Sequence, residues 1–238
     1  MKVKGFKASG IYSGIKRSGK KDLALIYSES PAQVSGVFTS NLVKAAPVII
    51  GQKKVKSGIC QAVVINSGIA NVCTGRQGVI DANDITKAVA KELRIKDSLV
   101  IPSSTGVIGS FLTSHIKKIK KAIPGLVKHL SENGINDASE AIMTTDAFSK
   151  ISSKKIRIDG RQTAITAIGK GAGMISPNMA TMLCFVMTDI ALDKKAQDRL
   201  LQSSVNSSFN KITVDGDTST NDTVLVLSNG FLGNKLIK

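Results

Sequence analysis

The sequence has no tryptophan, and aromatic residues make up 4% of its 238 residues. Stacking platforms for single-stranded nucleic acid are therefore scarce. Long apolar runs are also missing: the longest, which begins at Met182, meets Asp189 within a few residues, far short of the ~18 residues that a membrane-spanning helix needs. Met1–Gly5 contains no signal-peptide core, so export is not expected.

Metal-binding residues are few. The three cysteines, Cys60, Cys73 and Cys184, form no Cys-x-x-Cys pair, and their odd number favours a reducing compartment, the cytoplasm, over a disulfide framework or a structural zinc. A Ser-His-Asp triad or a histidine metal site would have to use His115 or His129. Both lie in or beside a lysine-rich region, and we expect them on the surface.

Acidic residues are in the minority, with 17 Asp and Glu against 33 Lys and Arg, a formal charge of +16. This imbalance keeps a basic nucleic-acid-binding module as one hypothesis. Most of the cations are lysines, however, whereas bidentate recognition of bases and phosphates prefers arginine. The densest run, Lys117–Lys121, is typical of a solvated helix face. We expect neither a nucleic acid nor a membrane as partner, and attraction of small anions instead.

The stretch Gly14–Lys21 comes close to a phosphate-binding P-loop. Its last position is a lysine without the hydroxyl that would bind magnesium, and the residues before it, Phe6–Gly10, form only a weak strand pattern. A basic loop that precedes a strand is the favoured interpretation.

Hydrophobic patterning predicts a single α/β domain without repeats or linkers. We expect helices over 84–93 with Asn83 or Asp81 as cap, over 116–130 with an interruption at Pro124-Gly125, over 137–143, and over 194–209 with Leu200, Leu201 and Val205 inward. Residues 155–165 should form a hairpin around Asp159-Gly160. Strands are expected over 23–27, 34–38, 62–65, 99–101, 182–190 and 222–227, with polar loops over 66–71 and 102–109.

A glycine-rich segment, Gly169–Gly173, leads to Ala180-Thr181 and a predicted strand. The glycine spacing does not fit a dinucleotide fingerprint. A threonine after a small residue suits an N-terminal nucleophile, which attacks its own preceding carbonyl and then uses the freed α-amine as base. A threonine that simply favours a strand fits the same pattern, so both interpretations stay open.

At Met174–Leu183 the chain resembles the self-cleavage junction of the ornithine acetyltransferase family, the bifunctional glutamate N-acetyltransferases of arginine biosynthesis. The resemblance extends over essentially the whole chain. Its further motifs are Gly5–Gly10, Lys20–Ala24, Asn66–Gly75, Ser104–Gly109, Met143–Asp146 and Asp215–Thr223.

The resemblance implies a role for each matching residue. Thr181 would be the nucleophile, released by cleavage after Ala180, and would carry the acetyl group from N2-acetyl-ornithine to glutamate. Thr105 and Gly106 would form the oxyanion hole. Thr144, Lys170 and Thr181 would bind substrate.

The family also implies a layered α/β sandwich, an α-chain region over 1–180 and a β-chain region from 181, and a heterotetramer of two α and two β chains. It implies no metal or cofactor, and in some members acetyl-coenzyme A as a further donor.

The sequence departs from the family in two ways. Ile69 stands where asparagine is expected, and the later substrate-binding Glu, Asn and Thr have no counterpart before Lys238. We therefore expect the C-terminal part of the sandwich to be missing. An inactive relative, or one half of a split enzyme, remains the alternative to an active acetyltransferase.

Overall fold

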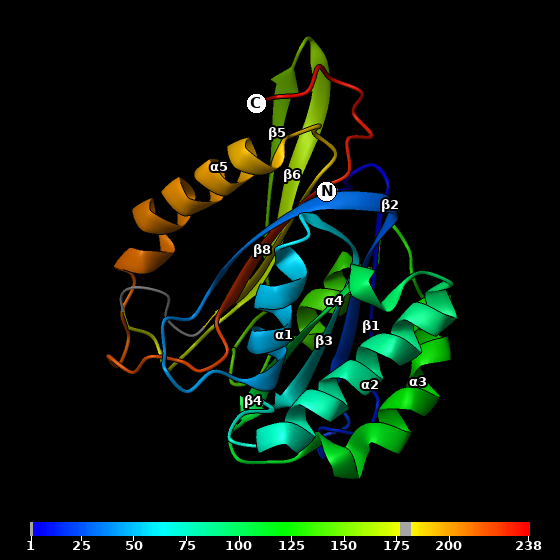
Figure 1. The fold of residues 1–238 in the computed structure, drawn as a ribbon, viewed down its shortest axis with the longest axis vertical. Coiled ribbons are helices and arrows are strands. Elements are labelled where there is room, and N and C mark those ends of the chain that lie inside the picture. The colour runs from blue at the N-terminus through cyan, green and yellow to red at the C-terminus, as the bar shows by residue number, and fades with distance from the viewer. Residues whose placement is uncertain (1, 177–181) are drawn as a thin grey trace.

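The computed structural model describes residues 2–176 and 182–238. In these two ranges eight strands form one mixed sheet in the order β4-β3-β2-β8-β7-β6-β5, and β1 pairs with β2 beside this series. Figure 1 shows the sheet running the length of the molecule, with the β5–β6 hairpin projecting at the top. The strands are β1 Phe6–Ile11, β2 Leu23–Phe38, β3 Ile59–Ile69, β4 Val100–Val107, β5 Lys150–Ile158, β6 Arg161–Lys170, β7 Leu183–Thr188 and β8 Thr223–Ser228.

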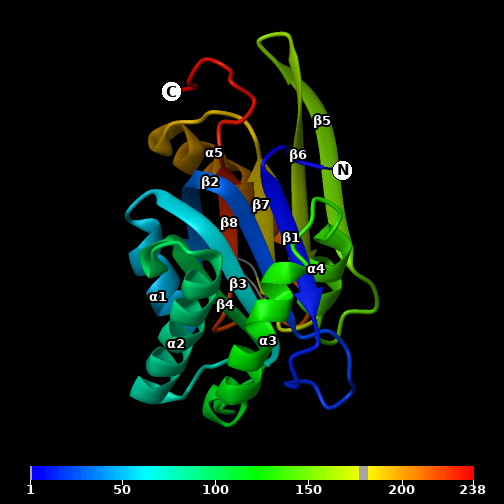
Figure 2. The same ribbon diagram turned by 90° about the vertical axis from the view of Figure 1, so that its right-hand side faces the viewer.

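Five α-helices accompany the sheet in the described ranges. They are α1 Ala46–Val55, α2 Gly75–Leu93, α3 Ile116–Lys128, α4 Ile135–Ala141 and α5 Lys194–Ser207. Figures 1 and 2 both show α2 and α3 side by side, with α5 at the other end of the sheet. Short 3-10 turns lie at Asp97–Leu99, Leu112–His115 and Phe209–Lys211.

The alternation of side chains along β2 shows on which face of the sheet α2, α3 and α4 lie. Ala24 and Ile26 join a core cluster with α4, whereas Leu23 and Leu25 join a second cluster with α2 and α3. Because successive strand side chains point to opposite faces, α4 lies on one face of this part of the sheet and α2 and α3 lie on the other. The layered α/β architecture predicted from the family resemblance is confirmed in this outline.

Several predicted elements are confirmed. The hairpin turns at Asp159 (φ 50°) and Gly160 (φ 75°), the positive pair that a tight hairpin favours. The strand predicted over 182–190 is β7, the one over 222–227 is β8, and the helices predicted over 137–143 and 194–209 are α4 and α5. In α5, Leu201 and Val205 are buried as expected, but Leu200 is exposed, so that part of the prediction is wrong.

The two strands predicted over 23–27 and 34–38 are one strand, β2. The register with β3 shifts between Tyr27 and Ala32, which marks a bulge that contains Pro31. Proline has no N–H for the ladder and is tolerated at such a bulge, so it does not end the strand.

The polar loops predicted over 66–71 and 102–109 belong largely to strands. β3 continues to Ile69 and β4 to Val107, and the two pair in parallel through Gly68 and Gly106. β4 lies at the edge of the sheet, where Pro102 costs no ladder bond on its outer side. Their small polar side chains are therefore placed by the sheet itself.

Two helix predictions also need correction. The predicted caps Asn83 and Asp81 are wrong, because α2 begins at Gly75; Asp81 lies inside the helix, where it accepts hydrogen bonds from Gln77 (2.8 Å) and Thr113 (2.7 Å). The interruption at Pro124 is also absent, because α3 continues through it. Its exposed proline leaves Ile123 and Leu126 on the buried face.

Candidate active site

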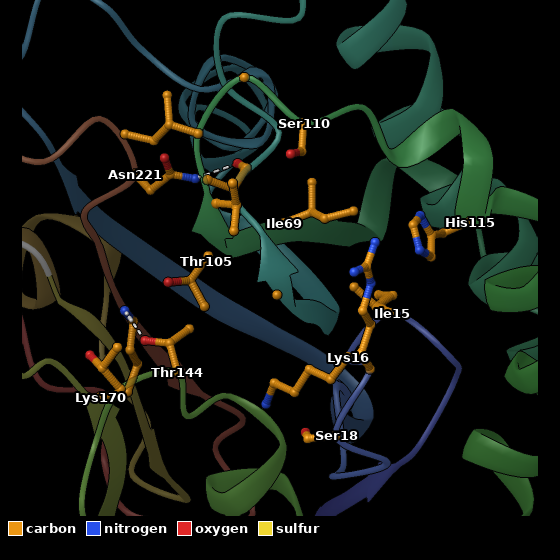
Figure 3. A pocket seen from close by; sticks show the side chains of 18 of the residues that line it. Ile15, Lys16, Ser18, Ile69, Thr105, Ser110, His115, Thr144, Lys170 and Asn221 are labelled. Carbon is orange, nitrogen blue, oxygen red and sulfur yellow. Dashed lines mark hydrogen bonds between the residues drawn. The ribbon is translucent and has the colours of Figure 1, made fainter.

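A cavity of about 1370 Å³ opens where the carboxyl ends of β3, β4 and β6 meet. β2 runs antiparallel to its neighbour β3, and β8 runs parallel to its neighbour β7. The loop before β2 and the residues that lead into β8 complete the walls of the cavity. Figure 3 shows Thr105, Thr144 and Lys170 gathered on one side of this cavity, with His115 on the far side. Four of the predicted site residues, Thr105, Gly106, Thr144 and Lys170, line this one cavity.

Thr105 and Gly106 end the edge strand β4. Thr105 is 5% exposed, and it faces Ser67 across the parallel pair. Gly106 has φ +133°, and a Cβ built there would lie 2.2 Å from the carbonyl carbon of Gly68. Only glycine fits this backbone conformation and this close approach. Thr105 and Gly106 therefore present a side-chain hydroxyl and a glycine backbone at the rigid end of β4.

Two buried asparagines hold the Thr105 strand end. Asn66 accepts a hydrogen bond from the Ser104 hydroxyl (2.6 Å) and donates to the Ile69 carbonyl (2.8 Å). Asn221 donates to the carbonyls of Ala70 (2.7 Å) and Ser104 (2.8 Å). Because these amides bridge β3, β4 and the residues before β8, the end of β4 is fixed from both sides.

Lys170 ends β6 and faces Thr144, to whose hydroxyl oxygen its Nζ donates a hydrogen bond of 3.3 Å. Lys170 is 6% exposed. Burial lowers the pKa of Lys170, and the charges of Asp146 and Asp222 oppose this shift only partly. In residues 2–176 and 182–238 no carboxylate forms an ion pair with Lys170, and a buried cation of this kind is suited to receive a carboxylate.

Asp146 fixes the two residues of this pair relative to each other. One oxygen accepts hydrogen bonds from Lys150 Nζ (2.6 Å) and the Gly171 N–H (2.8 Å), and the other accepts from the Thr144 N–H (3.1 Å). Burial raises the pKa of Asp146, but these hydrogen bonds outweigh burial, and the net shift is downward. Asp146 thus connects the Thr144 loop to the end of β6.

Residues 12–22 form a basic loop before β2, as predicted, and not a P-loop. Its organising group is the buried carboxylate of Asp22, which accepts backbone hydrogen bonds from Ser13 (2.6 Å), Ile15 (2.8 Å) and Lys16 (2.9 Å). The side-chain Nζ of Lys16 donates a hydrogen bond to the Met143 carbonyl (2.7 Å), beside Thr144. Lys16 and Arg17 both line the cavity.

The histidine prediction is half right. His129 is exposed, as predicted, whereas His115 is partly buried and lines the cavity. The sequence placed both beside the same lysine-rich helix, but it contained no signal that the turn before α3 faces the site. Ile69, the departure noted in the sequence, is a buried part of the cavity wall.

The predicted nucleophile Thr181 and cleavage residue Ala180 lie outside the described residues. Met174, which precedes them, lines the cavity. Met182, which follows them, donates its N–H to the Asp222 carboxylate at 2.9 Å. Asn221 and Asp222 belong to a motif that carried the resemblance, but nothing in the sequence assigned them a role.

Within residues 2–176 and 182–238 no group of three or more His, Cys, Asp or Glu residues is placed to hold a metal ion. The three cysteines are free thiols, with Cys60 and Cys184 buried and Cys73 exposed. Among the helices described, none is long and apolar enough to cross a membrane.

With this geometry in view, the chain can be compared with known proteins. The model of the ArgJ family matches residues 7–236. This chain belongs to the ArgJ family. The arginine biosynthesis bifunctional protein ArgJ of Caldanaerobacter subterraneus subsp. tengcongensis is 51% identical over 235 residues, which are 99% of this chain and 58% of that protein. ArgJ of Geobacter sulfurreducens is 47% identical over 237 residues, all of this chain and 60% of that protein. The chain therefore spans less than two thirds of the length of these relatives.

Solved ArgJ structures have the same fold. The arginine biosynthesis bifunctional protein of Bacillus halodurans superposes with a TM-score of 0.70 at 37% identity, covering 76% of this chain and 92% of that one. The ornithine acetyltransferase of Mycobacterium tuberculosis, solved in complex with ornithine, gives 0.64 at 32% identity, covering 76% and 94%. An Ochrobactrum anthropi aminopeptidase, described as a variant of the Ntn hydrolase fold, gives 0.56 at 14% identity and so shares the fold alone.

Proposed function

We propose that this ArgJ chain is the nucleophile-bearing part of a glutamate N-acetyltransferase that moves the acetyl group of N2-acetyl-ornithine to glutamate. One observation carries the proposal: a single cavity is lined by Thr105 and Gly106 together with the Lys170–Thr144 pair. An acyl-transfer site needs donors for an oxyanion and an anchor for substrate, and these four residues supply both.

The first proposed step is self-cleavage. The Thr181 hydroxyl attacks the Ala180 carbonyl, the Ala180–Thr181 C–N bond breaks, and the released amine takes up a proton. Water then hydrolyses the ester. The products are an acid at Ala180 and a free α-amine at Thr181, whose ordinary pKa near ~8 suits it to act as a base. Under this proposal, residues 1–180 and 181–238 belong to two separate chains.

Acetyl transfer then follows in two half-reactions. The Thr181 hydroxyl attacks the acetyl carbonyl, and the Thr105 hydroxyl and Gly106 N–H stabilise the oxyanion, a contribution of about 3 kcal/mol for each donor. Ornithine leaves, and the amine of glutamate attacks the acetyl ester. Both amino acids carry an α-carboxylate, which the buried ammonium of Lys170 binds while Thr144 orients it.

The wider features of the proposal come from the family resemblance. They are a cytoplasmic location, consistent with three free cysteines, an assembly of two α and two β chains, and acetyl-coenzyme A as a further donor in some members. None requires a metal or a cofactor.

The test of self-cleavage is the intact mass of the purified chain beside Thr181→Ala and Thr181→Ser. Wild type should give two fragments that meet between Ala180 and Thr181, Thr181→Ala should stay whole, and Thr181→Ser should still cleave because a hydroxyl remains. A wild-type chain that stays whole would contradict the proposed nucleophile.

The test of transfer is the appearance of N-acetyl-glutamate from acetyl-ornithine and glutamate. We expect product with wild type and none with Thr181→Ala. Cleavage without transfer would overturn the proposed substrates while leaving the nucleophile in place.

A further inference from the structure

Two carboxylates hold the chain on either side of residues 177–181. Before them, Asp215 accepts the N–H of Met174 on one oxygen (2.6 Å) and the N–H of Ile175 on the other (2.7 Å). After them, Asp222 accepts the N–H of Met182 at 2.9 Å. Both carboxylates belong to one short stretch, residues 213–223, which we call the anchor segment.

Backbone hydrogen bonds repeat the same connections. The Ile175 carbonyl accepts the N–H groups of Val214 (2.8 Å) and Gly216 (3.2 Å). The Met182 carbonyl accepts the N–H of Thr223 at 3.1 Å, where β8 begins beside β7. Each flank is therefore tied to the anchor segment by main chain and by a carboxylate, although the two flanks are separate in sequence.

The first of these anchors holds an uncommon backbone conformation. Met174 has φ +60°, a region that residues other than glycine seldom adopt. Its N–H is the group that donates to Asp215. Such a conformation persists only where the surroundings determine it, so the Asp215 contact has a specific geometry to maintain.

The second anchor uses a group that is costly to bury. Asp222 is 1% exposed, and among the described residues its second carboxylate oxygen has no hydrogen-bond partner. Burial raises the pKa of Asp222 to about 7, against the hydrogen bonds from the Met182 N–H and the Ser219 side chain and the positive charge of Lys170 on β6. Once ionised, this carboxylate is a charge-assisted acceptor for the Met182 N–H, which a neutral asparagine in its place would hold more weakly.

We propose that Asp215 and Asp222 are positioning residues for self-cleavage, which fix the two flanks of the segment that carries Ala180 and Thr181. The inference rests on the proposed function. Attack of a hydroxyl on a neighbouring carbonyl needs a near-attack geometry, and a segment with both flanks fixed loses less freedom in reaching it. The two aspartates exchange no proton or bond in this step; they hold backbone N–H groups.

The test is a time course of cleavage during cell-free synthesis of the full chain, quenched at intervals and followed by intact mass. We expect Asp215→Asn and Asp222→Asn to cleave at least about tenfold more slowly than wild type. Asp198→Asn is the matched control, because Asp198 is exposed on α5 and pairs only with the nearby Lys194. It should cleave at the wild-type rate.

Loss of stability alone has a separate control. Ile123→Ala weakens the packing of α3 in a core cluster that contains no residue of the two flanks or of the anchor segment, so it should cleave at the wild-type rate although it is less stable. In addition, the wild-type rate should rise with pH as Asp222 ionises near 7, and Asp222→Asn should lack that rise. Lys170 on β6 is the positively charged group that acts on Asp222.

The outcomes separate the two proposals. If wild type cleaves and both aspartate variants cleave at its rate, the positioning role is overturned while Thr181 keeps its role. If the variants slow only as much as Ile123→Ala, the role is structural and the inference is overturned as well. If wild type stays whole like Thr181→Ala, the proposed function itself is overturned.

Discussion

Lys170 has opposite effects on substrate binding and on the stability of the empty protein. Its ammonium is buried against Thr144, and no carboxylate among the described residues pairs with it directly, so the folded state loses the hydration of a charge. A site that takes an anionic substrate benefits from this arrangement, because the substrate carboxylate replaces the missing partner. The same residue is therefore expected to lower the stability of the empty protein.

Replacing this lysine should separate the two effects. Lys170→Met should lower kcat/KM for acetyl-ornithine roughly 10- to 100-fold, the loss of one charge-assisted hydrogen bond, while raising the free energy of unfolding near neutral pH. The lowered pKa of Lys170 means that wild-type stability increases with pH between that pKa and the ordinary 10.5, and the variant should lack this increase. Denaturant titrations at neutral and alkaline pH test it, with the exposed Lys155→Met as control. An unchanged kcat/KM would contradict the binding role.

Gly106 sets the backbone at the proposed oxyanion hole. Gly106→Ala should lower the free energy of unfolding by about 2–4 kcal/mol, because the new Cβ would meet the Gly68 carbonyl carbon in addition to the strain of φ +133°. Gly109→Ala is the matched control: it has φ +76° but nothing within 4 Å, so it should cost only about 1 kcal/mol. Equal costs at the two positions would show that the close approach to Gly68 has no energetic weight.

At the scale of single elements, α5 shows that helix periodicity alone does not determine which side chains contact the core. Its pattern made Leu200 and Leu201 equally plausible core residues, but Leu201 is 6% exposed over β7 and β8 while Leu200 is 55% exposed. Adjacent helix positions point about 100° apart, so only contact with the sheet decides which of them is covered.

This pair predicts a sharp difference in stability. Leu201→Ala should cost about 2–4 kcal/mol because it leaves a cavity under α5, whereas Leu200→Ala should change the free energy of unfolding by less than about 0.5 kcal/mol. Urea denaturation of both variants measures it. A similar cost for both would mean that α5 is packed through a different face.

The same reasoning explains which elements the sequence predicts. The hairpin at Asp159-Gly160 follows from two residues that tolerate positive φ, a local property. The continuity of β2 through Pro31 and of α3 through Pro124 depends on distant partners that hold the chain on both sides of each proline. Proline alone signals a break, and tertiary packing overrides that signal.

Some residues of the site could be predicted from the sequence, and others could not. Thr105, Gly106, Thr144 and Lys170 were identified through a family resemblance, and the structure brings them to one cavity. Asp146, Asp222 and Lys16 were missed because their roles arise from hydrogen bonds to residues distant in sequence, such as Lys16 to Met143. No local pattern encodes such partners.

At the scale of the whole molecule, the charge imbalance is larger on the surface than in the composition. Asp22, Asp81, Asp189 and Asp222 are buried, two of them (Asp22 and Asp222) as acceptors of backbone N–H groups, and they leave the surface lysines unneutralised. The formal charge of +16 thus lies mainly on an exposed surface whose positive groups repel one another.

Salt should therefore stabilise the protein. Raising the ionic strength to about 0.15 M shortens the screening length to about 8 Å, and we expect the melting temperature to rise by roughly 2–4 °C, equivalent to about 1 kcal/mol. Thermal melts at increasing sodium chloride concentration measure it. Replacing the exposed Lys117 and Lys121 on α3 by glutamate should make the salt effect smaller. A melting temperature that falls with salt would contradict the repulsion argument.

The position of β8 in the sheet has a consequence for the order of folding. β8 lies between β2 and β7, and its ladder joins Gln33 to Ser228. In the sheet, β7 and β8 lie between the β5–β6 hairpin and the strands of the first half. During synthesis, β1 to β4 and their helices can assemble early, but the centre of the sheet must wait for the last tenth or so of this sequence. Such pairing over a long sequence separation is slow. Until it forms, the facing edges of β2 and β7 remain open to pairing with other chains.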